Sequence, residues 1–172
     1  MRVAIVHARW NSEIVGQLVS GARSALEAAG VVPANILVES VPGSYELPLA
    51  CRKMIDSSSS SSSRSGENVD NDNVPVSVSQ SQTRPIDAVI AIGVLIKGQT
   101  MHFEYIADSV SHGLMRVQLD TGTPVVFGLL TVLSPEQART RAGMVEGEEN
   151  LAHGWAEAAV EMGVKLRKMG GG

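Results

Sequence analysis

A histidine directly follows a short turn-forming stretch, in the segment Gly98-Gln99-Thr100-Met101-His102. A glycine-containing turn at the start of a helix can hold a phosphate with its free backbone N–H groups. A single glycine turn is weak evidence, because the segment has neither the P-loop spacing nor the dinucleotide fingerprint. Histidine is the side chain best suited to proton transfer near neutral pH. The stretch therefore predicts a phosphate-binding turn with His102 as an acid–base group, and a surface or helix-capping histidine is the alternative.

The residues on either side of this turn predict where it lies in the fold. The apolar run 89–92 continues to Ile96 and indicates a strand that is buried on both faces. After the turn, apolar residues recur at helical spacing from Phe103 to Val117. The turn thus joins the carboxyl end of a parallel strand to a helix N-terminus, which is where open α/β sheets bind ligands.

The rest of the chain alternates in the same way between apolar runs and amphipathic segments. We expect Ser12 to cap the first long helix, and Pro135 to lie in the first turn of a later one. Four buried strands separated by helices indicate an α/β fold, a parallel sheet with right-handed crossovers and helices on both faces. The expected strands are 2–8, 35–41, 85–96 and 124–132, and the expected helices are 12–30, 42–55, 102–119, 134–143 and 150–169.

In such a sheet the carboxyl ends of all strands lie at one edge, so four loops should converge there. The side chains that these loops bring to one cleft are expected to be Trp10, Asn11, Ser44, Tyr45, Glu46, Thr100, His102 and Phe127.

Two of these residues have an equally simple structural interpretation. Trp10 beside Asn11 could form a stacking platform for a heterocycle, an interaction worth roughly 1–3 kcal/mol in base-binding proteins, or Trp10 could simply cap the core. Glu46 could accept hydrogen bonds from substrate hydroxyls, or it could only stabilise the first turn of a helix through the macrodipole. The residues alone leave both questions open.

Composition excludes several classes of protein. The 172 residues suit one domain with one core, and the net charge of −4 disfavours nucleic acid and anionic membranes as partners. Cys51 is the only cysteine, and His7, His112 and His153 share no ligand spacing with His102, so we expect no disulfide and no metal site. No segment is long and apolar enough to span a bilayer or to act as a secretory signal, so we expect a cytoplasmic protein.

One segment, about 57–84, interrupts the alternation with a run of serines and other polar residues. Such low-complexity sequence cannot bury enough apolar surface to offset its ordering entropy. We interpret it as a solvated insertion that lengthens one crossover within a single domain spanning 1–172.

Six blocks, taken in order, give the chain a family resemblance. The blocks HARWN, PGSYELP, GVLIKGQTMHFEYI, PVVFGLLT, EQARTRAG and AAVEM resemble those of 6,7-dimethyl-8-ribityllumazine synthase, most of all its fungal members. The resemblance extends over the whole chain except the serine-rich segment and the region 143–153.

The resemblance implies a flavodoxin-like three-layer sandwich with a four-stranded parallel sheet. It also implies the penultimate step of riboflavin biosynthesis: 5-amino-6-(D-ribitylamino)uracil condenses with 3,4-dihydroxy-2-butanone 4-phosphate to give 6,7-dimethyl-8-ribityllumazine, phosphate and water. The family needs no cofactor and no metal.

By the same resemblance, site roles fall on particular residues of this chain. Trp10 stacks on the pyrimidine, which Asn11 helps to hold, and His102 moves protons. The remaining residues bind the ring, the ribityl chain or the phosphate: Ser44, Tyr45, Glu46, Leu95, Ile96, Gly98, Gln99 and Thr100, with Phe127 and Arg141 coming from the neighbouring subunit of a homopentamer.

Some points stay open at this stage. Family members have a lysine or histidine near the start of the last helix, where this chain offers either Leu151 or His153. The connection before that helix is longer than in shell-forming relatives, which favours a free pentamer. Two rival functions are a flavin- or lumazine-binding protein without catalysis and a pentameric enzyme that makes riboflavin from two lumazines. The acid–base histidine, the phosphate turn and Arg141 argue for the synthase.

Overall fold

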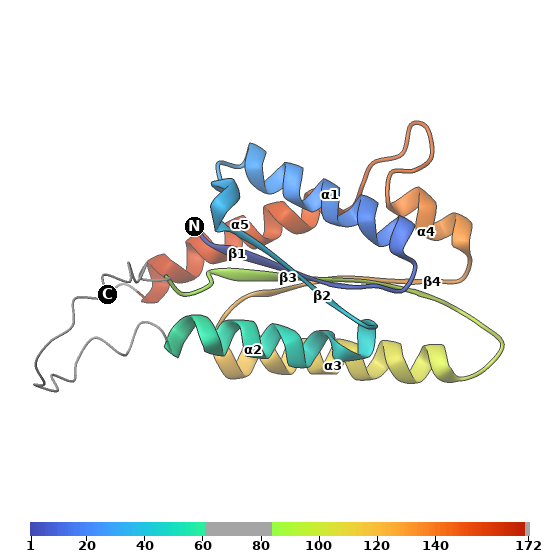
Figure 1. Cartoon of the computed structure of the whole chain (residues 1–172), viewed down its shortest axis with the longest axis horizontal. Helices are drawn as coiled ribbons and strands as arrows, with labels where there is room; N and C mark the ends of the chain where they lie inside the picture. The colour runs from blue at the N-terminus through green and yellow to red at the C-terminus, as the bar shows by residue number, and fades with distance from the viewer. Residues whose placement is uncertain (61–83, 171–172) are drawn as a thin grey trace, which may run out of the picture.

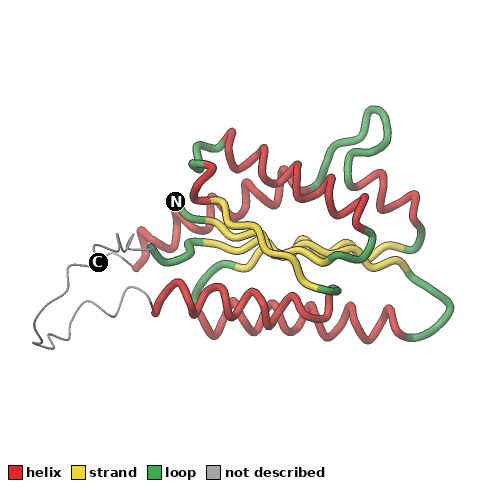
Figure 2. Tube along the Cα trace, viewed as in Figure 1, coloured by secondary structure: helices red, strands yellow, loops and turns green. Residues whose placement is uncertain are grey.

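Four parallel strands form the central sheet of the computed structural model, which describes residues 1–60 and 84–170 (Figures 1 and 2). Every pair of neighbouring strands is parallel, with Val3 opposite both Ile36 and Ala88 and with Val89 opposite Val125. The strand order β2-β1-β3-β4 is that of flavodoxin-like folds, so the predicted sheet is confirmed. The strands are β1 (Val3–Ala8), β2 (Ile36–Val41), β3 (Ala88–Ile96) and β4 (Val125–Val132).

Helices cover both faces of this sheet, as predicted (Figure 1). Alternate strand residues point into two separate cores: Val3 and Ile5 belong to one cluster, and Ala4 and Val6 to the other. Two short 3-10 segments, η1 (Pro33–Asn35) and η2 (Ser44–Glu46), flank β2. One face carries α1 (Ser12–Ala28), α4 (Pro135–Arg141) and α5 (Ala152–Gly170), and the other carries α2 (Leu47–Ser60) and α3 (His102–Thr121).

The cap of α1 differs from the prediction. The N-cap is Asn11, not Ser12, and Asn11 has a left-handed backbone with φ 58°. Asparagine is one of the few residues with a side chain that tolerates this conformation. At α4 the expectation holds, because Pro135 is the first helical residue and the hydroxyl of Ser134 accepts a hydrogen bond of 3.3 Å from Gln137 N.

The predicted start of the insertion, at about residue 57, is too early. Residues 57–60 are the last turn of α2, and Ser58 is buried there. Its hydroxyl donates to Ile55 O at 2.8 Å and accepts from Ile86 N at 3.1 Å, which ties the end of α2 to the segment that leads into β3. Local polarity suggested a loop, but these hydrogen bonds satisfy the buried serine. The remainder, 61–83, lies outside the described residues.

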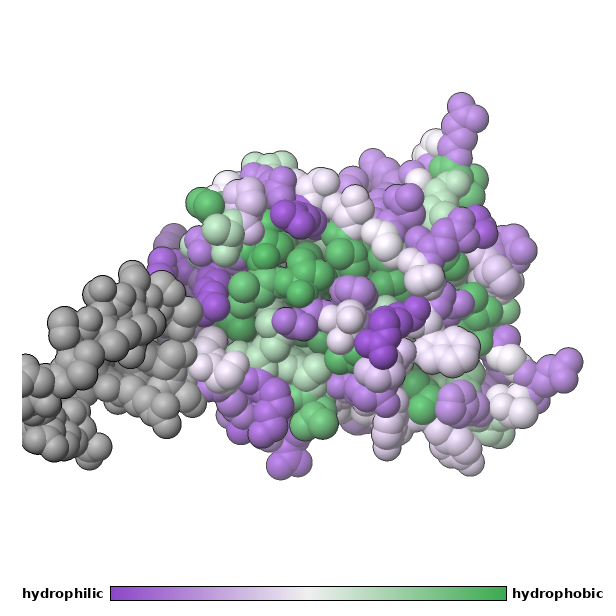
Figure 3. Space-filling view, viewed as in Figure 1, coloured by the Kyte–Doolittle hydropathy of each residue, from purple (hydrophilic) through white to green (hydrophobic). Residues whose placement is uncertain are grey.

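The edge strand β2 leaves apolar surface open between the two helical layers. In Figure 3 apolar side chains gather in the middle of the visible face, between the helical layers. Val38 of β2 and Val32 just before it are both exposed. A sheet edge of this kind can accept a partner.

A glycine in the middle of β3 lets the site loop pack closely on the sheet. A Cβ atom on Gly93 would lie 2.6 Å from Ser44 Oγ and 2.7 Å from Leu129 Cδ1. No real Cβ contact is that short, so the hydrogen of glycine is what allows Ser44 to be buried against β3.

We therefore expect Gly93→Ala to lower the free energy of unfolding by about 1–3 kcal/mol, the usual cost of overpacking. The matched control is Gly16→Ala, because Gly16 lies inside α1 and nothing is within 4 Å of an added Cβ. Alanine should stabilise that helix by roughly 0.5–1 kcal/mol. Urea unfolding of both variants checks the prediction, and equal stabilisation by the two alanines would contradict it.

Candidate functional site

Two adjoining hollows lie at the carboxyl ends of β1, β2 and β3. One has a volume of about 610 Å³ and the other about 780 Å³. They share a wall formed by Trp10, Asn11, Pro42 and Ile96. We call the first the ring cavity, lined by Trp10, Asn11, Pro42, Gly43, Ser44, Tyr45, Glu46, Val94, Leu95, Ile96, His102 and Ile106, and the second the outer cavity.

Trp10 presents its indole to the outside of the chain, with 74% of the residue exposed. It therefore does not cap the core of this chain, and the face of the indole is open to a ligand or to a partner. Gly43 lies beside the indole, and an added Cβ there would be in ordinary contact with it, 3.5 Å from Trp10 Cδ1.

Asn11 connects the loop after β1 to the end of β3. Its side-chain Nδ2 donates to Val94 O at 2.9 Å. This bond uses one amide hydrogen of Asn11 and fixes the orientation of the side chain at the cavity wall. An amide carbonyl oxygen accepts hydrogen bonds, so the oriented group can read a donor of a bound ring.

The loop after β2 supplies one buried and two more accessible side chains. Ser44 is buried, whereas Tyr45 is 61% exposed. One carboxylate oxygen of Glu46, Oε2, accepts from Gly43 N at 2.8 Å and so closes the η2 turn. Glu46 thus has a structural role, but it is a hydrogen bond within a 3-10 turn and not the macrodipole effect that the sequence suggested. The carboxylate keeps further lone pairs for substrate hydroxyls, because an ionised carboxylate has about four acceptor positions.

The turn after β3 borders the ring cavity. Leu95 and Ile96 line the cavity, whereas Gly98, Gln99 and Thr100 are exposed beside it. His102 is the first residue of α3 and lines the same cavity as Trp10. Its backbone N–H donates to Thr100 Oγ1 at 3.4 Å.

An ion pair spans this turn. Lys97 Nζ donates to Glu104 Oε1, and this hydrogen bond is the main cause that lowers the pKa of the Glu104 carboxyl. Glu104 is therefore ionised at neutral pH and balances the charge of Lys97 beside the turn. The pair holds the start of α3, and with it His102, close to the end of β3.

Phe127 and Arg141 lie away from both cavities. Phe127 is 44% exposed on β4, at the sheet edge farthest from β2. Arg141 ends α4, where it is exposed and its Nη1 donates to Gln137 O at 3.4 Å. Neither lines the cavities that contain Trp10, so within one chain these two predicted residues do not join the others.

Leu151 and His153 differ in their position relative to Arg141. The backbone N–H of Leu151 donates to Arg141 O at 3.0 Å, which places Leu151 beside the arginine. His153 is exposed in the first turn of α5. Neither residue lines the ring or outer cavity.

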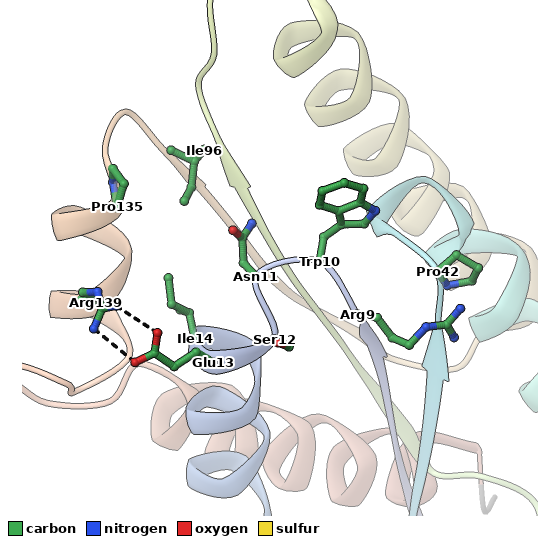
Figure 4. Close-up of a pocket in the computed structure, with 10 residues that line it drawn as sticks. All are labelled: Arg9, Trp10, Asn11, Ser12, Glu13, Ile14, Pro42, Ile96, Pro135 and Arg139. Atoms are coloured by element: carbon green, nitrogen blue, oxygen red, sulfur yellow. Dashed lines mark hydrogen bonds and ion pairs between the residues drawn. The ribbon is translucent and has the colours of Figure 1, made fainter.

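The outer cavity contains charged residues that the sequence patterns did not single out. Arg9, Glu13 and Arg139 line it, and Arg139 pairs with Glu13 through two hydrogen bonds (Figure 4). The two partners are 126 positions apart, so no local spacing could have revealed the pair.

The described part of the chain contains no group of three or more histidine, cysteine or acidic side chains that could bind a metal ion. Within residues 1–60 and 84–170, no helix combines the length and the apolar character needed to cross a membrane. Cys51 lies in the core, and burial raises the pKa of its thiol to about 12. Cys51 is therefore a packing residue.

Comparison with known proteins identifies relatives over nearly the whole chain. A relative named 6,7-dimethyl-8-ribityllumazine synthase from Pyricularia oryzae is 52% identical, over 100% of this chain and 91% of its own. One of the same name from Schizosaccharomyces pombe is 48% identical, over 96% and 87%. A bacterial one, from Clavibacter michiganensis, is 36% identical, over 99% and 88%.

The sequence model of one family matches residues 1–64 and 72–167, and it is described as 6,7-dimethyl-8-ribityllumazine synthase. These matches include every loop that forms the ring cavity, and the resemblance seen in the sequence is confirmed. The chain belongs to the 6,7-dimethyl-8-ribityllumazine synthase family.

Proposed function

We propose that this chain is an enzyme that condenses 5-amino-6-(D-ribitylamino)uracil with 3,4-dihydroxy-2-butanone 4-phosphate. The products are 6,7-dimethyl-8-ribityllumazine, phosphate and water, and the reaction is the penultimate step of riboflavin biosynthesis. The observation that carries the proposal is the arrangement of Trp10, Glu46 and His102 around one cavity in a chain of this family.

The chemistry needs proximity and proton transfer more than it needs a cofactor. The amine of the pyrimidine condenses with the ketone and releases one water, phosphate is then eliminated, and closure of the ring by the nitrogen that carries the ribityl chain releases a second water. Each step moves protons, and none changes the overall oxidation state. Holding the two substrates together and supplying one acid–base group is therefore sufficient.

We assign roles to the cavity residues accordingly. The exposed Trp10 stacks on the pyrimidine, Asn11 and the backbone at Leu95 and Ile96 bind its edges, and His102 transfers protons at the carbonyl. The remaining groups bind the ribityl chain or the phosphate: Ser44, Tyr45 and Glu46 for the former, and Gly98, Gln99 and Thr100 for the latter.

We also propose that the chain forms a homopentamer whose active sites lie between subunits. Phe127 and Arg141 are exposed, and they lie away from the ring cavity. A neighbour can therefore supply them more easily than the same chain can. A head-to-tail contact of this kind is heterologous: each subunit uses two different surfaces. Every subunit has both surfaces covered only if the subunits form a closed ring. Several large apolar side chains are exposed on one chain and would be covered: Tyr45, Leu49, Met101, Tyr105, Met115, Leu119 and Phe127.

The same proposal treats residues 1–172 as one domain in the cytoplasm. The single cysteine, Cys51, is a free thiol in the core, as is usual for proteins of a reducing compartment.

The direct test mixes the purified protein with the pyrimidine and the butanone phosphate and follows the absorbance of the lumazine. We expect the rate to survive exhaustive dialysis against a chelator, because the described residues offer no cluster that could hold a metal. A rate that vanishes on dialysis and returns with a divalent metal would contradict the proposed chemistry.

Replacing His102 tests its role as acid–base group. We expect His102→Ala to lower kcat at least about tenfold, toward the 10²–10⁴-fold that positioned acid–base groups usually contribute. The matched control is His112→Ala, since His112 is also exposed on α3 but does not line the ring cavity. If the two variants kept the same kcat as the unmodified protein, His102 would be only a helix-terminal residue.

Subunit mixing tests the shared active site. His102→Ala and Arg141→Ala chains should each be much less active than the unmodified protein when assembled alone. Mixed under conditions that allow subunit exchange, they should regain activity, because some sites then combine an intact His102 with an intact Arg141 from the neighbour. A mixture without activity despite demonstrated exchange, or full activity from a monomer in light scattering, would contradict the shared site.

A further inference from the structure

The ion pair of the outer cavity joins α1 and α4. The residues just before α1 belong to the chain's own ring cavity, whereas α4 carries Arg141, which we propose acts in the neighbouring subunit. Arg139 Nη2 lies 2.9 Å from Glu13 Oε2, and Nη1 lies 3.3 Å from Oε1 (Figure 4). Glu13 is in the first turn of α1, directly after the Trp10–Asn11 wall of the ring cavity. Arg139 is in α4, the short helix that ends at Arg141.

Few other side-chain contacts fix the rotation of α4 about its axis. The helix has seven residues, and Ala138 is the only one of them that is buried. Backbone contacts gather at the last turn, where Leu151 N donates to Arg141 O, Met144 N donates to Arg139 O and Ala142 bridges to Asn150. On the side that faces α1, the ion pair is the side-chain contact that adds to them. Within the described residues, the pair with Glu13 is the only ion pair from α4 to another element.

The geometry of a helix then relates Arg139 to Arg141. Successive residues are about 100° apart around an α-helix, so side chains two positions apart point in nearly opposite directions. When Arg139 faces Glu13 and the outer cavity of its own chain, Arg141 must face away from both. The direction of one arginine thus determines the direction of the other.

We propose that Glu13 and Arg139 are positioning residues, and that their ion pair sets the rotation of α4 so that Arg141 points at the phosphate of a substrate bound in the neighbouring subunit. The inference rests on the proposed shared site. An exposed ion pair contributes little to folding stability. Its bidentate geometry does define an orientation, which is what a binding arginine at the end of a short helix requires.

The test breaks the pair and then rebuilds it with exchanged charges. We expect Arg139→Met and Glu13→Gln to raise KM for the butanone phosphate on the order of tenfold, because small displacements of positioning groups have large effects. KM for the pyrimidine should not change. The double variant Glu13→Arg plus Arg139→Glu should recover most of the loss. Lys165→Met, which breaks the Lys165–Glu161 pair on α5, is the matched control and should leave both KM values unchanged.

A dilution experiment locates the defect. Arg139→Met chains are assembled with an excess of His102→Ala chains, so that nearly every active site receives its Arg141 from a chain with an intact ion pair. The rate of His102→Ala chains assembled alone is subtracted, because those sites keep up to about a tenth of the activity. We expect KM for the butanone phosphate, taken from the remaining rate, to return to the unmodified value. A KM that stays raised would place the defect in the chain's own cavity and would overturn the inference.

The same assays distinguish a failure of the proposed function from a failure of the proposed positioning role. Unmodified protein that forms no lumazine in the same assay would contradict the proposed function itself, and the positioning role with it. Unmodified protein that turns over normally while Arg139→Met keeps its KM would overturn only the positioning role.

Discussion

The hydrogen bond from Asn11 Nδ2 to Val94 O ties the loop after β1 to the end of β3, and the ring cavity depends on this connection. The two strands concerned, β1 and β3, are neighbours at the centre of the sheet, and both are buried on both faces. Because the sheet is rigid, fixing their ends relative to each other fixes Trp10 on one loop against the turn that leads to His102 on the other. Asn11 makes this bond from a left-handed backbone conformation at the N-cap of α1.

The loop after β2 completes the cavity by a different means. It has no comparable long-range side-chain bond, and its shape comes from the local bond between Gly43 N and Glu46 Oε2 together with the close packing of Ser44 on Gly93. A residue that is needed for the shape of a turn can also bind substrate when it is a carboxylate, since one oxygen closes the turn while other lone pairs remain free. The structural and functional interpretations of Glu46 are thus compatible.

Local patterns in the sequence were sufficient for the strands, the helices and the edge at which the loops meet. Hydrophobic periodicity is a local property, and the rule that parallel strands end at one edge needs only their order. Neither periodicity nor strand order predicts contacts between residues that are distant in the sequence. The Glu13–Arg139 pair joins positions 126 apart, and the hydroxyl of Ser58 at the end of α2 accepts from Ile86 N, 28 positions further along the chain. The cap at Asn11 was missed for the same reason, as its side chain binds β3 instead of its own helix.

The ring cavity is open to solvent in a single chain, and this exposure bears on how the chain assembles. Condensation and elimination require the substrates to be held close and bulk water to be excluded, yet Trp10 and Tyr45 are mostly exposed on one chain. A platform that is open on one side binds a flat ring weakly, because only one face of the ring loses water. The chain places its remaining aromatic candidate, Phe127, at the far edge strand, where it cannot cover its own cavity. In the homopentamer that we propose, Phe127 of a neighbouring copy covers the platform that the chain's own Phe127 cannot reach.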